Sequence, residues 1–186
     1  MNPISKKKNL EEVVENLREL SYSYLEKYSP TKQQLRTYLF KKIIIKKKLL
    51  NDKKDVLHLI DLVIANLEKN SLINDKFYSD SQSKNYLKKG YSINKIRHTL
   101  FKKGINNNYI EESISKIKEV EFDPDFFSAI KLCHRRKIGP NRNESNRKLF
   151  YKKDMGILAR SGFDFETSKK VMDLEKDEYL KIINLL

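Results

Sequence analysis

The chain has 186 residues, of which 39% are hydrophobic and 34% are charged, and its formal net charge is +14. This apolar content is sufficient to build packed cores, which excludes a wholly disordered chain. Five glycines and four prolines supply too few turn residues for a protein made of many short strands, so the composition favours helices.

The N-terminal segment carries no targeting signal that we can identify. Residues 1–8 are basic, but no apolar segment follows them as it would in a signal peptide. No apolar stretch approaches the roughly 20 residues that span a bilayer. The single cysteine, Cys133, excludes a disulfide framework within one chain and fits a reducing compartment. We therefore expect a cytoplasmic protein with no membrane partner.

Residues 9–74 predict a first three-helix unit. Apolar residues from Leu10 to Tyr24 recur at helical spacing and predict its first helix. Ser29–Pro30 supplies an N-cap and a first-turn proline for the second helix. An insertion near residues 43–54 predicts that this second helix is lengthened, and another apolar stripe follows it.

Residues 75–121 predict a second three-helix unit. Either Asn74 or Asp75 is placed to cap its first helix. Gly90 follows the two lysines at the predicted end of that helix, where a left-handed residue commonly closes the last turn.

The next two helices of this unit also have recognisable ends. Ser92 is the predicted cap of the second helix, and Gly104 is predicted to close it in a left-handed conformation. Asn108 and Glu111 form a variant capping box at the predicted start of the third helix. The second helix has four apolar residues at positions that share one face: Ile93, Ile96, Leu100 and Phe101.

Residues 122–186 predict a third three-helix unit with an extended C-terminal helix, or with that helix doubled. Asp123–Pro124 supplies a cap and a first-turn proline, and Gly139–Asn141 breaks the helix that follows. A further helix is predicted to end near Ser161, and Asp164 is the predicted cap of the next one.

An internal repeat relates the three units. The octet Leu35–Lys42 matches Ile96–Lys103: apolar residues recur at the same positions, an Arg follows the first, and both octets end in Phe-Lys-Lys. A fainter third copy ends at Phe163 and places Gly162 in register with Gly104. Repeated units bury their apolar faces by stacking on their neighbours. The sequence therefore predicts an all-α tandem array of three three-helix repeats, elongated and curved.

No pattern in the chain indicates catalysis. The three histidines, His58, His98 and His134, are far apart, and the adjacent pair Cys133 and His134 points to different faces of a helix. There is no glycine-rich phosphate loop, no Gly-x-Ser-x-Gly elbow and no His-Glu-x-x-His motif. We expect no enzyme activity, no catalytic residues, no metal site and no cofactor.

The net positive charge favours polyanionic partners such as nucleic acid. A coding bias towards Lys, Asn and Ile would also raise the lysine content, so the eight arginines are the more informative cations. The planar guanidinium group suits phosphate or carboxylate recognition. The candidate contacts with a partner or nucleic acid are Arg36, Lys41, Lys42, Arg97, Lys102, Lys103, Arg135, Arg136, Arg142, Arg147, Lys152, Lys153 and Arg160.

Two further readings concern nucleic acid. The tyrosines that lie beside lysines could stack on exposed bases, although we favour core or rim positions for most of them. A trihelical unit can also act as a helix-turn-helix, with the helix of residues 92–103 in a major groove. A DNA-binding protein that acts alone through such tandem units is therefore the alternative function.

Several segments resemble the RecX family of bacterial regulatory proteins, which modulate the recombinase RecA. The resemblance is carried by Leu67–Phe77, by the stretch from Lys88 to Ile105 and by Arg160–Phe163, in matching order and spacing over about residues 10–175. The chain departs from the family pattern at the insertion, at Tyr78 and at Ser161.

The resemblance implies a curved stack of three-helix repeats that binds in the helical groove of a RecA–single-stranded DNA filament. There it would inhibit filament growth and the ATPase, strand exchange and coprotease activities of RecA, as part of DNA repair and the SOS response. The expected partners are the RecA filament and single-stranded DNA, contacted directly or through RecA, and the protein is expected to be a monomer.

Overall fold

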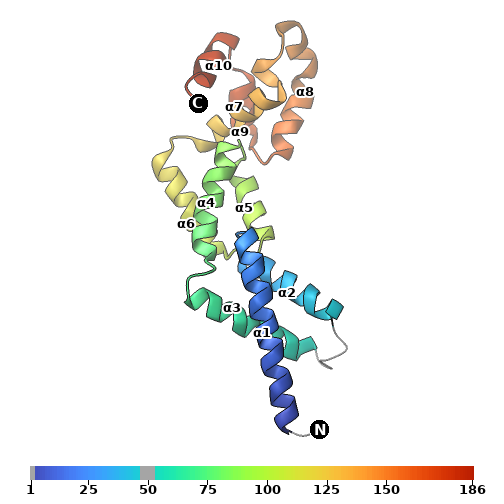
Figure 1. Cartoon of the computed structure of the whole chain (residues 1–186). Coiled ribbons are helices and arrows are strands. Elements are labelled where there is room, and N and C mark those ends of the chain that lie inside the picture. Colours follow the sequence, from blue (N-terminus) through green and yellow to red (C-terminus); the bar gives the residue numbers. More distant parts are fainter. Residues whose placement is uncertain (1–2, 47–52) are drawn as a thin grey trace. The chain divides into compact units, whose positions relative to one another are not determined.

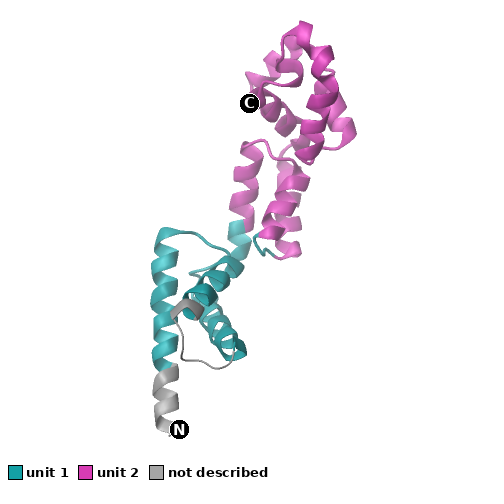
Figure 2. Ribbon diagram, turned by 90° about the vertical axis from the view of Figure 1, so that its right-hand side faces the viewer, with its two compact units in different colours: residues 1–78, 103–105 teal, residues 79–102, 106–186 magenta. Residues whose placement is uncertain are grey.

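The computed structural model describes residues 3–46 and 53–186 (Figure 1). Within these residues every regular element is a helix, so the prediction of an all-α fold is confirmed. Contacts divide the chain into two compact units (Figure 2). Unit 1 comprises residues 1–78 with 103–105, and unit 2 comprises residues 79–102 with 106–186. The division into three repeats stays a prediction.

Unit 1 contains α1 (Pro3–Lys27), α2 (Lys32–Lys46), α3 (Lys53–Lys69) and the first turn of α4 (Asp75–Lys88). Apolar residues at helical spacing on the first three helices meet in one core, because only together can the helices remove these faces from water. The fully buried members of this core include Leu17, Leu35, Leu39, Ile60 and Leu67.

The start of α2 differs from the prediction at Ser29–Pro30. The backbone N–H of Gln34 donates to Thr31 Oγ1 at 3.1 Å, and the N–H of Thr31 donates to Gln34 Oε1 at 3.0 Å. This reciprocal pair is a capping box, which places the cap two residues later than predicted. The helix continues past Phe40 to Lys46, and residues 47–52 of the predicted insertion lie outside the described residues.

Unit 2 contains the remainder of α4 and the helices that follow it. These are α5 (Ile93–Lys102), α6 (Asn107–Val120), α7 (Pro124–Arg136), the short 3₁₀ helix η1 (Gly139–Asn141), α8 (Glu144–Arg160), α9 (Phe165–Met172) and α10 (Lys176–Ile183). A core shared by the last five elements surrounds the fully buried side chains of Ile130, Leu158 and Tyr179. The C-terminal segment forms two helices, α9 and α10, with a break after Met172, which is the doubled form of the two that the sequence left open.

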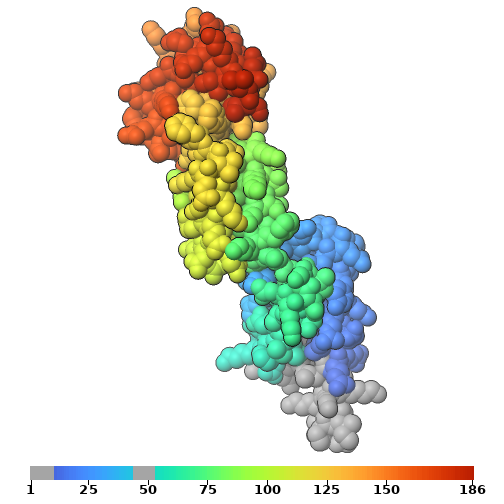
Figure 3. Space-filling model, turned by 90° about the vertical axis from the view of Figure 1, so that its left-hand side faces the viewer, coloured from blue at the N-terminus to red at the C-terminus, as the bar shows by residue number. Residues whose placement is uncertain are grey.

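In unit 2, α4 and α6 lie side by side (Figures 1 and 3). Small side chains occupy their contact: Ser113 Oγ donates to Ser79 Oγ at 2.8 Å, and Ser79 Oγ donates to the carbonyl of Tyr109 at 3.1 Å. Residues without bulky side chains let two helix backbones approach closely. Here the hydroxyl groups of Ser79 and Ser113 find their hydrogen-bond partners within the contact.

Most predicted helix ends agree with the structure. The side chains of Ser92, Asp123 and Asp164 accept backbone N–H bonds in the first turns of α5, α7 and α9, so all three predicted caps are confirmed. Gly104 and Gly162 have φ values of +79° and +87°, as predicted for left-handed residues that close a helix.

Two predictions for the second three-helix repeat, residues 75–121, were wrong. Asn106, not Asn108, caps α6, because its side chain accepts the N–H of Asn108 at 2.9 Å. Glu111 is bound to Arg97 and so does not complete a capping box. Phe101, predicted on the buried face of α5, is 62% exposed.

Candidate nucleic-acid and partner interface

The N-terminus of α2 is held by residues distant in sequence, all within unit 1. Thr31 Oγ1 donates to the carbonyl of Lys103 at 2.6 Å, and the N–H of Lys32 donates to Asp75 Oδ1 at 2.9 Å. Gly104 packs against this first turn so closely that a Cβ atom there would overlap the side chain of Gln33. The free N–H groups of a helix start are thus satisfied partly by a carboxylate from the next helical segment.

The N-terminus of α5 in unit 2 has the same set of contacts. Ser92 Oγ donates to the carbonyl of Ser161 at 2.8 Å, and the N–H of Ile93 donates to Asp125 Oδ1 at 2.7 Å. A Cβ atom on Gly162 would lie 2.5 Å from Ser92 Oγ. We call each of these two sets a helix joint: a capping hydroxyl, an aspartate carboxylate and a left-handed glycine around one helix start.

The aspartates of the two joints are partly desolvated. Burial raises the pKa of Asp75 above its ordinary value, although the N–H of Lys32 opposes this shift. Burial likewise raises the pKa of Asp125, and the nearby carboxylates of Asp164 and Asp123 add to the effect. Sequence reasoning did not find these roles. The available signal was an Asp in the first turn of α4 and another in the first turn of α7, the helices that begin the second and third predicted three-helix repeats.

Arg36 and Arg97, two candidate contact residues, bind carboxylates within their own units. Arg36 pairs with Asp61 through two hydrogen bonds of 2.6 and 2.9 Å, which joins α2 to α3. Arg97 pairs with Glu111 through bonds of 2.7 and 3.0 Å, which joins α5 to α6. The hydrogen bonds from the guanidinium groups lower the pKa of Asp61 and of Glu111.

Arg142 is placed by a buried carboxylate. Its guanidinium group donates to both oxygens of Asp154, at 2.6 and 2.9 Å, and lies over the ring of Phe150. Asp154 is fully buried and also accepts the N–H of Gly139 at 2.9 Å. Burial tends to raise the pKa of Asp154, but these donors and the charge of Arg142 outweigh it, and the pKa is lowered. Arg142 therefore fixes η1 against α8.

Arg147 also has a structural position. Its guanidinium group donates to the carbonyls of Met172 and Leu174, which lie at the end of α9 and in the turn after it. A cation at a helix C-terminus satisfies carbonyls that have no partner within the helix. Arg147 thereby fixes α8 against α9.

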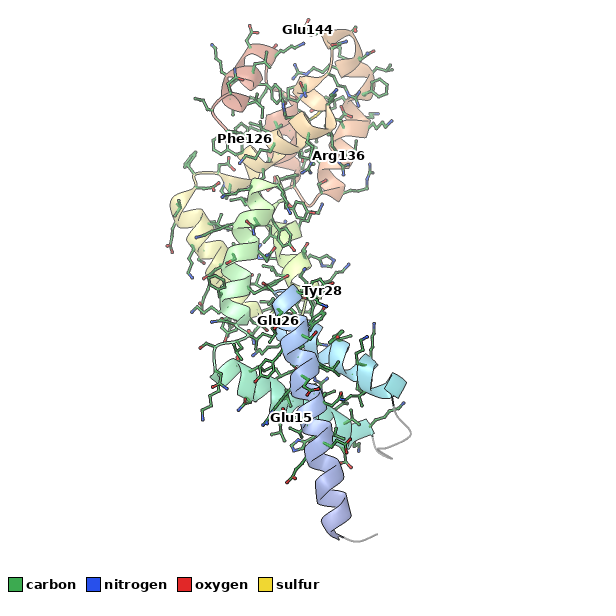
Figure 4. The ribbon with its side chains drawn as sticks, in the orientation of Figure 1. Glu15, Glu26, Tyr28, Phe126, Arg136 and Glu144 are labelled. Atoms are coloured by element: carbon green, nitrogen blue, oxygen red, sulfur yellow. The ribbon has the colours of Figure 1, made fainter. Side chains whose placement is uncertain are left out.

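The other candidates are mostly exposed. Lys42 lies over the ring of Tyr38, Lys153 lies over Phe150, and Lys103 Nζ donates to the hydroxyl of Tyr78. Arg135 Nη1 donates to the carbonyl of Lys89, which brings α7 to the end of α4. The remaining exposed candidates are Lys41, Lys102, Arg136, Lys152 and Arg160, and Arg136 is labelled on α7 in Figure 4.

The structure thus separates the thirteen candidates into two groups. Arg36, Arg97, Arg142 and Arg147 bind acceptors of the protein itself, and so do Lys103 and Arg135. In the last third of the chain, Arg142 and Lys153 are brought together over Phe150. Arg36, Lys41, Lys42 and Lys103 belong to unit 1, and the other candidates belong to unit 2. The exposed cations remain available to a partner.

The described residues contain neither a candidate metal site nor an exposed thiol. Among them, no three His, Cys, Asp or Glu side chains are grouped to hold a metal ion. Cys133 is buried, and burial, together with the charge of Asp154, raises the pKa of its thiol to about 12. A polar hollow of about 310 Å³ in unit 2 is bordered by Arg97, Lys118 and Asp123, among others.

None of the described helices combines the length and the apolar character that a bilayer crossing requires.

No family model matches the sequence. Two curated relatives are similar to it, and both are named regulatory protein RecX. The one from Myxococcus xanthus (strain DK1622) is 27% identical over 152 residues, which cover 81% of this chain and 80% of the relative. The one from Clostridioides difficile (strain 630) is 31% identical over 128 residues, which cover 66% of this chain and 57% of the relative.

Two solved structures share the fold. A crystal structure of regulatory protein RecX superposes with a TM-score of 0.64 at 19% identity, covering 89% of this chain and 74% of that one. The crystal structure of RecX from Lactobacillus salivarius superposes with a TM-score of 0.59 at 16% identity, covering 94% of this chain and 99% of that one.

Proposed function

Because this chain belongs to the RecX family of regulatory proteins, we propose that it regulates the recombinase RecA by binding the RecA–single-stranded DNA filament. In this proposal the bound protein inhibits filament growth and the ATPase, strand exchange and coprotease activities of RecA. The observation that carries it is the likeness to regulatory protein RecX over 81% of the chain.

The charge of the chain supports the choice of target. A filament of recombinase on single-stranded DNA presents phosphates, and a chain of net charge +14 is attracted to them. Such attraction raises the rate of encounter more than it raises the affinity. The helix joints support it as well, because repeated units can present similar surfaces to a partner that is itself repetitive.

The test is a RecA ATPase assay on single-stranded DNA, in which this protein is titrated from far below to above the RecA concentration. A regulator that blocks a growing filament end affects many subunits, so we expect inhibition at molar ratios well below one. Full inhibition should persist when the order of addition is changed, provided that filaments are still exchanging subunits.

The alternative is a DNA-binding protein that acts alone, and the net charge of +14 is the observation that favours it. Such a protein must coat the DNA lattice, so inhibition would follow DNA coverage and would disappear when excess DNA is added. That result would contradict the proposal.

A variant separates charge from folding in the same assay. Reversing the charge of Arg136 to Glu should weaken inhibition, while circular dichroism should stay unchanged. Arg135 and Arg147 are excluded from this test because both donate to backbone carbonyls of the protein itself, Arg135 to Lys89 and Arg147 to Met172 and Leu174. Unchanged inhibition by the variant would exclude Arg136 from the interface.

A further inference from the structure

Two segments of unit 2 contain no acidic residue at all. Residues 81–102 form a run without Asp or Glu, and so do residues 126–143. The chain as a whole has 25 acidic residues, so ordinary surface pairing would be expected to place some of them here. Cations in these segments therefore have no local carboxylates from neighbours in sequence.

The fold packs these two segments against each other. A Cβ atom on Gly90 would lie 3.0 Å from the carbonyl oxygen of Ser128 and 3.1 Å from Lys131 Cβ, so the turn after α4 touches the middle of α7. Arg135 Nη1 donates to the carbonyl of Lys89 in the same place. Lys89, Lys131 and Arg135 take part in this contact, and Lys88 and Arg136 are their neighbours in sequence. We call these five basic residues the basic cluster.

The cations of this cluster are available to a ligand. Within the part of the chain that the structure describes, Lys88, Lys89 and Arg136 have exposed side chains that form no ion pair with a carboxylate. Arg136 is labelled on α7 in Figure 4. Like charges held together without counterions create a positive potential that favours a polyanion.

A pair of stacked aromatic rings adjoins the basic cluster. Tyr86 in the last turns of α4 and Tyr91 just after Gly90 have ring centroids 5.2 Å apart and planes inclined by 11°. Lys95 Nζ lies 4.1 Å from the centroid of Tyr91. Both rings are partly exposed. Lys95 of α5 thus lies on one ring of the pair, and Lys88 and Lys89 lie between the two tyrosines in sequence.

Aromatic rings among unpaired cations are the features that bind single-stranded nucleic acid, since unpaired bases stack on the rings and phosphates contact the cations. We infer that Tyr86, Tyr91 and the basic cluster form a binding site for single-stranded DNA, which this chain contacts directly. The inference rests on the proposed function in that the proposed function places this site at the RecA–single-stranded DNA filament. Bases of an intact duplex are already stacked and cannot use the rings.

The test measures binding of the full chain to a fluorescent oligo-dT strand of about 20 nucleotides by anisotropy, without RecA. Replacing Lys88, Lys89 and Arg136 together by Gln should weaken binding and reduce the slope of log affinity against log salt by about 2, since each phosphate contact on a single strand contributes roughly 0.7. The matched control replaces three cations of α9 and α10, Lys169, Lys176 and Lys181, by Gln. Its slope of log affinity against log salt should equal that of the parent chain.

The tyrosines are tested by a pair of substitutions at one position. Y86A should weaken binding of the single strand by about 5- to 150-fold, because stacking of one base is lost, whereas Y86F keeps the ring and should bind as the parent chain does. Binding to a duplex of the same length should be equal for Y86A and Y86F. Circular dichroism and a melting curve verify that each variant is folded.

The outcomes are separable from those of the proposed function. If the cluster variant and Y86A bind oligo-dT as the parent does, the inference is overturned, whatever the RecA assay gives. An equal loss with the α9–α10 control, or an equal loss of duplex binding by Y86A, overturns it as well. If the parent binds oligo-dT through these residues but leaves the RecA ATPase unaffected, the inference stands and the proposed function fails.

Discussion

Ser92 and Ser161 are 69 residues apart, yet Ser92 Oγ donates a hydrogen bond of 2.8 Å to the carbonyl of Ser161. The same hydroxyl accepts the N–H of Lys95 at 3.1 Å and thereby caps α5. One side chain thus starts a helix and fixes the end of another, α8, against it. Thr31 has the corresponding two roles for α2 and the carbonyl of Lys103.

This double role makes Ser92 a sensitive position. Ser92→Ala removes a cap, which typically contributes about 1 kcal/mol, and leaves the Ser161 carbonyl without its donor. We expect the free energy of unfolding to fall by roughly 1–3 kcal/mol in a urea titration. Ser92→Thr keeps the hydroxyl, as the natural Thr31 does, and should retain most of the stability. Equal losses for both variants would assign the effect to packing instead.

Gly104 and Gly162 should not tolerate a side chain. Their φ values of +79° and +87° disfavour any Cβ atom, and an added Cβ would also collide with Gln33 or with Ser92 Oγ. We expect Gly162→Val and Gly104→Val each to lower the free energy of unfolding by more than about 1 kcal/mol.

Gly156 is the matched control for these glycines. It lies within α8 at ordinary negative φ, and a Cβ atom there would meet only the flexible end of Arg160. Gly156→Ala should therefore leave the protein as stable or stabilise it by up to about 1 kcal/mol. A melting temperature that falls as far in Gly156→Ala as in the other variants would contradict the argument from φ.

Leu100 and Phe101 are neighbours in α5 with opposite surroundings. Leu100 is fully buried and Phe101 is 62% exposed. We expect Leu100→Ala to cost about 2–5 kcal/mol in chemical denaturation, because it leaves a cavity in the core. Phe101→Ala should change the stability by less than about 0.5 kcal/mol. A larger effect at Phe101 would indicate that its ring is covered in solution.

The Arg142–Asp154 pair makes stability depend on acid pH. The folded-state pKa of Asp154 is lowered below the ordinary value of about 3.9, so the ionised carboxylate stabilises the folded protein above that value. This contribution should be lost as the pH falls through the lower folded-state pKa. Asp154→Asn should destabilise the protein by about 1–3 kcal/mol at neutral pH, since a hydrogen-bonded buried charge is removed.

The same variant should show a flatter fall in melting temperature below about pH 4 than the parent. Asp61→Asn is a useful comparison, because Asp61 and Arg36 form an exposed ion pair whose attraction is screened by solvent and salt. We expect a smaller change there. Parallel melting curves of the parent and Asp154→Asn across the acid range would exclude Asp154 as a source of the acid dependence.

Several features followed from the sequence because they depend on residues close together in the chain. Helix caps at Ser92, Asp123 and Asp164 use a hydroxyl or carboxylate within three residues of its donor, and Gly104 and Gly162 meet a local backbone requirement. The all-α fold followed in the same way from apolar spacing and scarce turn residues. These are local rules, and the sequence alone is enough to apply them.

The tertiary structure decided the features whose partners are distant in sequence. Thr31, not Ser29, caps α2, and its hydroxyl also reaches the Lys103 carbonyl 72 residues away. Arg142 was expected at an interface, but a buried carboxylate on α8 holds it within the fold. A guanidinium group has the same chemistry whether its acceptor is a partner's phosphate or the protein's own carboxylate. Packing alone determines which acceptor lies within reach, so the role of each arginine could not be read from its position in the sequence.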